Sequence, residues 1–155
     1  MAEDKPITLD QLRARASDDA RAILDRIWDY YCEQLAGMPA MELWPRFRGK
    51  GSVREALTPL GQTVVRLDWE NGKECYRVPL LGVLVSNRGL EAECLLLRYL
   101  EYVRERYSKG EVGPITGEQL EKERGFSFEQ SQFLSKLLNG SVFSGAASIP
   151  NNIAE

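Results

Sequence analysis

The sequence predicts a mainly helical α+β fold, in which a small β-hairpin is set among helices. Apolar residues recur at three- and four-residue spacing over most of the chain, as they do in amphipathic helices. Residues 62–69 and 73–78 instead alternate, and Asn71-Gly72 between them is the strongest short signal for a hairpin turn. A hydrophobic fraction of 43% in 155 residues is enough to bury a core.

The first helical region is expected to start at Thr8, because Thr8 and Gln11 have the spacing of a capping box. Apolar residues then continue at helical spacing as far as Leu35. The region is either one long helix or two helices with a break near Ser17-Asp18-Asp19, where a second cap is available. Gly37 and the proline that follows it are expected to end the region.

Two short helices are expected next. Residues 41–47 can form a single turn, because Pro45 prevents a longer helix around it. Ser52 is expected to cap a helix over residues 53–60, which Gly61 ends. Together with the first helices and the hairpin, these segments predict a shared core of Ile27, Trp28, Tyr31, Val53, Leu57, Leu60, Val64, Leu67 and Tyr76.

The second half of the chain is expected to be helical. Residues 80–86 are apolar and form either a strand or a helical turn. Residues 90–107 form the clearest helix, and its core-facing stripe is predicted to be Leu90, Cys94, Leu97, Leu100 (or Tyr99) and Val103. Residues 117–123 and 128–138 are expected to form a helical hairpin, with a hydroxyl residue capping each helix.

These elements divide the chain into four parts: an N-terminal tail and helix extension over residues 1–19, a winged-helix-like unit over 20–85, a helical unit over 86–140 and a flexible tail over 141–155. The winged-helix-like unit contains three helices and a two-stranded hairpin. Its order of helix, short helix, helix, strand, turn and strand is the winged-helix layout. The helical unit contains the long helix and the C-terminal helical hairpin, which has the pattern of a helix-turn-helix.

Residues 52–65, with the sequence SVREALTPLGQTVV, resemble the run TVREAL..L...G of GntR-type bacterial regulators. In that family the run forms the third helix and leads into the wing. The resemblance therefore implies a winged helix-turn-helix fold and a DNA-binding regulator of transcription. The family's arginine-bearing second helix has no recognisable counterpart in residues 41–49, MELWPRFRG.

A local basic run favours nucleic-acid binding, although the net charge of the chain is −3. Residues 46–54 hold four cations with no acid among them. In a winged helix this run would precede and begin the recognition helix, whose N-terminus also attracts phosphate. Two further cations flank the hairpin, where they can reach neighbouring phosphates. The predicted contacts to double-stranded DNA are Arg46, Arg48, Lys50, Ser52, Arg54, Arg66 and Lys73.

The alternative function is a non-catalytic protein-interaction or oligomerisation module on the same scaffold. Residues 86–155 carry eight basic against ten acidic side chains, which does not favour DNA binding by the second half. Leu96, Tyr99 and Tyr102 widen the apolar surface of helix 90–107 beyond the roughly 100° stripe of an ordinary surface helix. This helix is therefore expected either to form a homodimer interface through these three residues or to lie between the two halves of the chain.

No feature of the sequence predicts catalysis or a cofactor. The chain has no histidine, no closely spaced cysteine pair and no glycine-rich phosphate loop. Cys32, Cys75 and Cys94 are expected to be buried, reduced thiols. The polar N-terminus lacks the pattern of a signal peptide, and no apolar run approaches the length of a membrane span. We therefore expect a non-enzymatic cytoplasmic protein that binds neither a metal nor a membrane.

Overall fold

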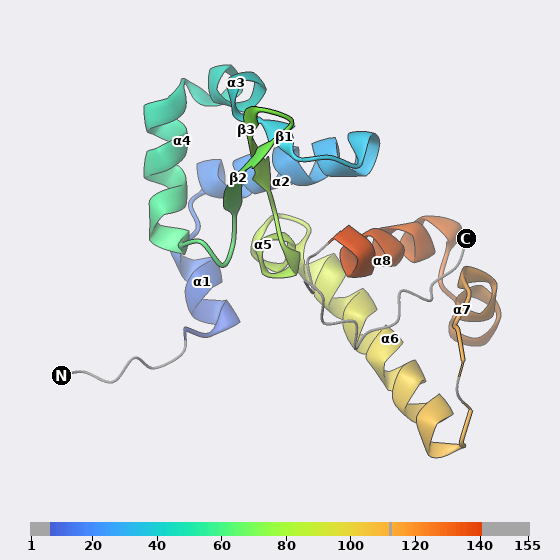
Figure 1. The fold of residues 1–155 in the computed structure, drawn as a ribbon. Helices are drawn as coiled ribbons and strands as arrows, with labels where there is room; N and C mark the ends of the chain where they lie inside the picture. The colour runs from blue at the N-terminus through green and yellow to red at the C-terminus, as the bar shows by residue number, and fades with distance from the viewer. Residues whose placement is uncertain (1–6, 112, 141–155) are drawn as a thin grey trace. The chain divides into compact units, whose positions relative to one another are not determined.

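The computed structural model describes residues 7–111 and 113–140, and it confirms a mainly helical α+β fold with a small sheet (Figure 1). The chain divides into two compact units, Met1–Gly89 and Leu90–Glu155. The sheet lies in the first unit, and the described part of the second unit is helical. The predicted flexible tail over residues 141–155 and the first six residues of the N-terminal tail lie outside the described residues.

The first helical region is two helices, α1 (Leu9–Arg15) and α2 (Asp18–Gln34), which decides between the two alternatives that the sequence left open. Thr8 caps α1 through the expected capping box, and the Ser17 hydroxyl accepts the backbone N–H of the third residue of α2. The end of α2 differs from the expectation. Leu35 ends the helix in a left-handed conformation with φ 57°, two residues before the predicted glycine.

Four short helical segments cover the next region: α3 (Ala40–Leu43), η1 (Trp44–Phe47), α4 (Lys50–Leu57) and η2 (Thr58–Leu60). The predicted cap of α4 is wrong. Gly49, with φ 104°, is the N-cap, and Ser52 lies inside the first turn of the helix. A positive φ at both Arg48 and Gly49 reverses the chain earlier than expected, so that the Gly49 carbonyl accepts the N–H of Val53.

The sheet has three antiparallel strands in the order β1-β3-β2: β1 (Met38–Pro39), β2 (Arg66–Glu70) and β3 (Lys73–Arg77). The hairpin at Asn71-Gly72 is confirmed, and both turn residues have the left-handed φ values, 53° and 77°, that such a turn requires. The first hairpin strand begins at Arg66 and not at residue 62. The pairing of β1 with β3 was not predicted, because two residues carry no periodicity.

The core of the first unit contains most of the residues that the sequence predicted. Ile27, Trp28, Val53, Leu57, Leu60, Val64 and Tyr76 are all buried. Tyr31 is half-buried. The prediction for Leu67 is wrong, because this side chain is 44% exposed. Leu67 lies on β2, which is the edge strand of the sheet.

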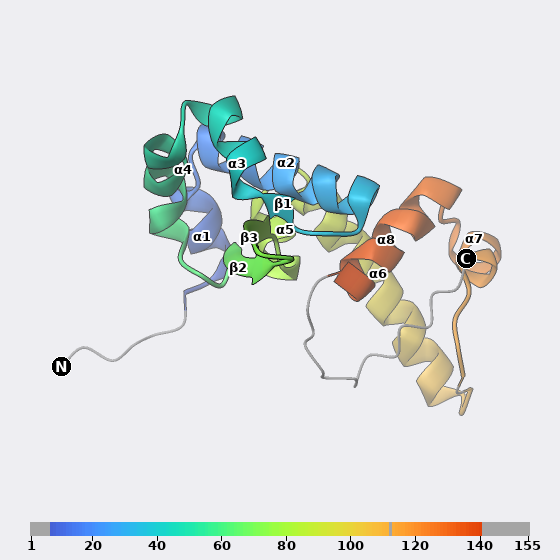
Figure 2. The same ribbon diagram turned by 45° about the horizontal axis from the view of Figure 1, so that its top comes forward.

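Helix α4 packs against α2 and lies at the outer edge of the first unit in Figure 1 and in Figure 2. Its buried residues are Val53 and Leu57. Lys50, Arg54 and Glu55 of this helix are exposed. This orientation turns part of the predicted basic run toward solvent.

The apolar segment after the hairpin is a short helix, α5 (Leu80–Val85), which decides between the two predicted alternatives. It packs against α1 and α2, and the Arg13 guanidinium donates a 2.9 Å hydrogen bond to the Leu84 carbonyl. Gly82 faces the chain that leads into β2. A Cβ at this position would overlap the Val64 carbonyl oxygen and the Val78 side chain, so only glycine fits.

A bidentate ion pair joins the two strands of the hairpin, and its carboxylate also binds the residue that precedes β1. Arg77 donates hydrogen bonds of 2.6 and 2.9 Å to the two carboxylate oxygens of Glu70, and the Gly37 N–H donates a 3.4 Å hydrogen bond to the same carboxylate. Both side chains are about a quarter to a third exposed. The hydrogen bond from Arg77 lowers the pKa of Glu70, which shows that the pair favours the ionised carboxylate.

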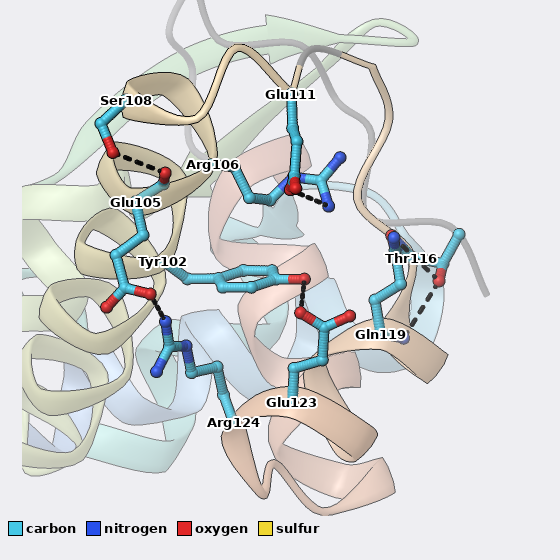
Figure 3. A network of polar contacts seen from close by, with 9 residues as sticks. All are labelled: Tyr102, Glu105, Arg106, Ser108, Glu111, Thr116, Gln119, Glu123 and Arg124. Carbon is cyan, nitrogen blue, oxygen red and sulfur yellow. Dashed lines mark hydrogen bonds and ion pairs between the residues drawn. The ribbon is translucent and has the colours of Figure 1, made fainter.

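The second unit contains α6 (Gly89–Ser108), α7 (Gly117–Arg124) and α8 (Phe128–Gly140). The two-helix hairpin and its Thr116 and Ser127 caps are confirmed. Figure 3 shows how α6 is held to α7. The Tyr102 hydroxyl donates a 2.8 Å hydrogen bond to Glu123, and the guanidinium groups of Arg106 and Arg124 lie 5.7 and 5.1 Å from its ring centroid.

The prediction of which side of α6 faces the core is wrong. The buried residues are Ala92, Leu95, Tyr99 and Tyr102. The predicted stripe is largely exposed, with Leu90 at 74%, Leu97 at 60% and Leu100 at 49%. Tyr99 and Tyr102 are therefore not available for the predicted interface, and Leu96 is half-buried beside them. The sequence has apolar residues on both sides of this helix, so periodicity could not choose between the sides.

We predict that Gly82→Ala strongly destabilises the first unit, by about 2–3 kcal/mol or more, because a methyl group has no space beside Val64. Gly51→Ala is the matched control, since Gly51 lies in α4 with nothing near its added Cβ. This control should stabilise the protein by about 0.5–1 kcal/mol through helix propensity. Urea denaturation of both variants measures the difference, and equal effects at the two positions would contradict the packing of Gly82.

We predict that Glu70→Gln lowers the free energy of unfolding by about 1–2 kcal/mol at neutral pH, because it removes a charge-assisted bond. A lowered folded-state pKa means that the unfolded chain binds the proton more readily. The stabilisation is therefore full above the unfolded pKa of about 4.3 and is lost as the pH falls through the folded-state pKa.

The difference between wild type and Glu70→Gln should accordingly shrink below about pH 4.3 in denaturation curves recorded at several pH values. Glu33→Gln, at an exposed position on α2, is the control and should change stability by less than about 0.5 kcal/mol. A difference that stays constant into strong acid would show that the ion pair is not its source.

Candidate nucleic-acid interface

The predicted DNA-binding residues lie around α4, where the structure separates most of them into two grooves. One groove runs between α4 and β2 and is called the sheet-side groove. The other lies between the start of α4, η1 and the beginning of α2, and is called the turn-side groove. The volumes of the two grooves are ≈ 540 Å³ and ≈ 450 Å³. Both grooves lie wholly within the first unit.

The sheet-side groove brings together three of the predicted cations, Lys50, Arg54 and Arg66. Lys50 and Arg54 are one helical turn apart on α4, and Arg66 begins β2 on the opposite wall. The groove also has an apolar lining made by Leu57, Val65, Leu67 and Tyr76. Its one acid, Asp68, lies 3.6 Å from Arg66. A groove lined by three cations and by apolar side chains can bind an anionic partner that also has non-polar surface.

The turn-side groove contains Arg46, Arg48 and Ser52, together with Arg15 from α1. Asp19 and Glu55 also line it, so its charges are more evenly balanced than those of the sheet-side groove. Ser52 faces this groove from inside the helix and does not cap it. The seventh predicted residue, Lys73, is exposed at the start of β3 and lines neither groove.

The four cations of residues 46–54 share the property that they have no acidic partner. Among the residues that the structure describes, Arg46, Arg48, Lys50 and Arg54 form no ion pair. Other arginines are engaged: Arg21, Arg77, Arg88, Arg106 and Arg124 in ion pairs, and Arg13 and Arg98 with backbone carbonyls. Because these four positive charges are not neutralised, the surface around α4 has a local positive field, although the net charge of the chain is −3.

Lys50 is positioned by an aromatic contact. Its Nζ lies 5.1 Å from the centroid of the Trp44 ring, and the Trp44 Nε1–H donates a 3.2 Å hydrogen bond to the Tyr76 hydroxyl. Trp44 therefore links the start of α4 to β3. The cation–π contact leaves the ammonium exposed, so it orients Lys50 without neutralising its charge.

Three residues near these grooves are not among the predicted DNA contacts. Trp69 is 73% exposed on β2, and Leu67 is exposed two residues earlier on the same face of the strand. Arg15 reaches the turn-side groove from a helix outside the predicted winged-helix-like unit. The alternation of β2 does place Trp69 beside Leu67, but it cannot tell which face of an edge strand is covered.

The cysteines are free thiols in three different environments. Cys75 is buried, and burial raises the pKa of its thiol. Cys32 is half-buried, and Cys94 is exposed on α6, which corrects the expectation that all three are buried. In the described part of the chain, no three Cys, Asp or Glu side chains gather in a group that could hold a metal ion.

None of the helices in the described ranges is both long enough and apolar enough to cross a membrane. Comparisons of the chain with protein-family models, with curated proteins and with solved structures find no match.

Proposed function

We propose that the first unit contains a winged helix that binds double-stranded DNA, with α4 as the recognition helix and β2–β3 as the wing. The order of its elements supports this assignment: α2, β1, α3 with η1, α4 and then the hairpin. The strand order β1-β3-β2 places the hairpin at one edge of the sheet, where a wing projects. The resemblance of residues 52–65 to GntR-type bacterial regulators concerns the same helix and the approach to the same wing.

The absence of ion-pair partners for the cations around α4, within the described residues, is the observation that carries the proposal. An α-helix with its side chains is about 10–12 Å in diameter, and the major groove of B-DNA is about 12 Å wide, so α4 can enter it. Gly51 and Glu55 lie on the side of α4 opposite Val53 and Leu57, and the absence of a side chain at Gly51 permits close approach to the bases. Lys50 and Arg54 would then contact phosphates on one flank of the groove.

The wing would contact the backbone beside the same groove through Arg66 and Lys73. On the other flank of α4, Arg46 and Arg48 would reach phosphates from the turn before the helix. Phosphate contacts of this kind set affinity and orientation, while sequence is read by side chains that face the base edges. All of the proposed contacts come from the first unit.

The rival function, a protein-interaction module, is favoured by a different surface. The exposed leucines of α6 belong to the second unit and lie apart from the basic run in the sequence. An interaction through that surface needs no positive charge, so the two functions are compatible in one chain and are separable by mutation.

We predict that Lys50→Gln combined with Arg54→Gln weakens binding to random-sequence duplex DNA and reduces its salt dependence. Each lost phosphate contact lowers the slope of log K against log salt by about 0.9, so the pair should lower it by about 1.8. Thermal stability should change little, because both side chains are exposed. Fluorescence-anisotropy titrations at several salt concentrations measure the slope.

The matched control is Lys109→Gln with Lys122→Gln, which changes the net charge equally at exposed positions of the second unit. A third variant, Arg46→Gln with Arg48→Gln, tests the turn-side groove alone. DNA binding through α4 would be contradicted if the affinity of wild type did not depend on salt concentration, or if the control pair lost as much affinity as the α4 pair.

We predict that Trp69→Ala weakens duplex binding by roughly tenfold, because an exposed indole on the wing can pack against sugar or base surface. Trp28 is buried and Trp44 is half-buried, so Trp69 should report binding by a change in tryptophan fluorescence. Met41→Ala, at a position 75% exposed on α3, is the control for loss of exposed apolar surface. An unchanged affinity in Trp69→Ala would exclude the indole from the interface.

A further inference from the structure

Helix α6 carries an apolar stripe on the side opposite its buried residues. The large exposed side chains of this stripe are Leu90 (74%), Leu97 (60%), Leu100 (49%) and Tyr107 (74%). At 100° per residue, Leu97 lies opposite the centre of the buried side, which contains Leu95, Tyr99 and Tyr102. The stripe therefore contributes nothing to the contacts that bury those residues.

The spacing of the stripe is that of a helix–helix seam. Leu90, Leu97 and Arg104 follow one another at seven-residue intervals, and so do Glu93, Leu100 and Tyr107. The two series are offset by three residues, as the a and d positions of a heptad are. A strict seven-residue repeat on an exposed helix side is the pattern that packs against a second helix.

We infer that this face pairs α6 with α6 of a second copy of the chain, in an antiparallel dimer with two-fold symmetry. If the axis passes between Arg98 and Tyr99, Leu97 lies opposite the partner's Leu100 and Leu90 lies opposite the partner's Tyr107. The same register places Arg104 opposite the partner's Glu93. Every apolar position of the two series then meets an apolar position, and the remaining positions meet an opposite charge.

The charges of Arg104 and Glu93 favour a second copy of the chain as the partner and an antiparallel arrangement of the two helices. In a parallel pair, Arg104 would face the partner's Arg104, and Glu93 would face the partner's Glu93. Like charges would then repel each other at both positions. The antiparallel pair replaces both repulsions by two equivalent ion pairs, one on each side of the axis. A seam of one helix per subunit is a small interface, so the dimer is expected to dissociate on dilution.

Sedimentation velocity over a wide range of protein concentration tests this dimer. Wild type should change from monomer to dimer as the concentration rises. Leu97→Glu with Leu100→Glu should remain a monomer throughout, with its helical circular dichroism retained because both positions are exposed. Phe128→Glu, on a 62% exposed residue of α8, is the matched control and should dimerise like wild type.

The register has a separate test by charge exchange. Arg104→Glu alone should weaken the dimer, because it places two acids together on each side of the axis. Adding Glu93→Arg should restore dimerisation, since the exchanged pair recreates the same ion pairs. A parallel or non-specific association would show no such rescue, and that result would overturn the register.

A wild-type protein that stays monomeric at the highest concentration, or a loss of dimer in Phe128→Glu equal to that in the leucine variant, would overturn the dimer itself. None of these experiments uses DNA. Their outcome is therefore independent of the function proposed for α4.

Discussion

The burial of Val53 and Leu57 decides which side chains of α4 reach solvent. These two residues pack the helix against α2, and the helical repeat then fixes the direction of every other position. Lys50 and Arg54 emerge toward the sheet, whereas Ser52 and Glu55 emerge toward the turn. A basic run that is continuous in the sequence thus becomes two surfaces of different charge, separated by the body of the helix.

The opposite wall of the sheet-side groove depends on the placement of the hairpin. Glu70 and Arg77 form a bidentate pair beside the turn at Asn71-Gly72, and Gly37 ties the same carboxylate to the end of β1. These hydrogen bonds pair the charges of Glu70 and Arg77, which are partly removed from water. It leaves β2 as an edge strand whose outer face carries Leu67 and Trp69, next to Arg66. Apolar side chains are unusual on an exposed edge strand, and here they lie beside the groove that has the larger excess of cations over acids.

Helix α6 of the second unit has apolar residues on two sides, and the contacts of Tyr102 hold one of these sides against α7. Tyr102 is held by Glu123 and by two guanidinium groups from α6 and α7, and burial is the main cause of its raised pKa. That cluster turns one side of α6 inward. The other side keeps its leucines exposed and has the seven-residue repeat of a helix pair. The inward side contributes Tyr102 and its polar contacts to the second unit, and the outward side carries the face of the proposed dimer.

The sequence by itself determined the local features whose signals lie within a few residues: the Thr8 capping box, the Thr116 cap, the hairpin at Asn71-Gly72 and the concentration of cations in residues 46–54. Only the tertiary structure decided which faces of the elements are covered. It placed Gly49 and not Ser52 at the start of α4, exposed Leu67 and reversed the two sides of α6. The physical reason is that periodicity gives the angle between side chains along one element, whereas burial depends on which neighbouring element packs against it.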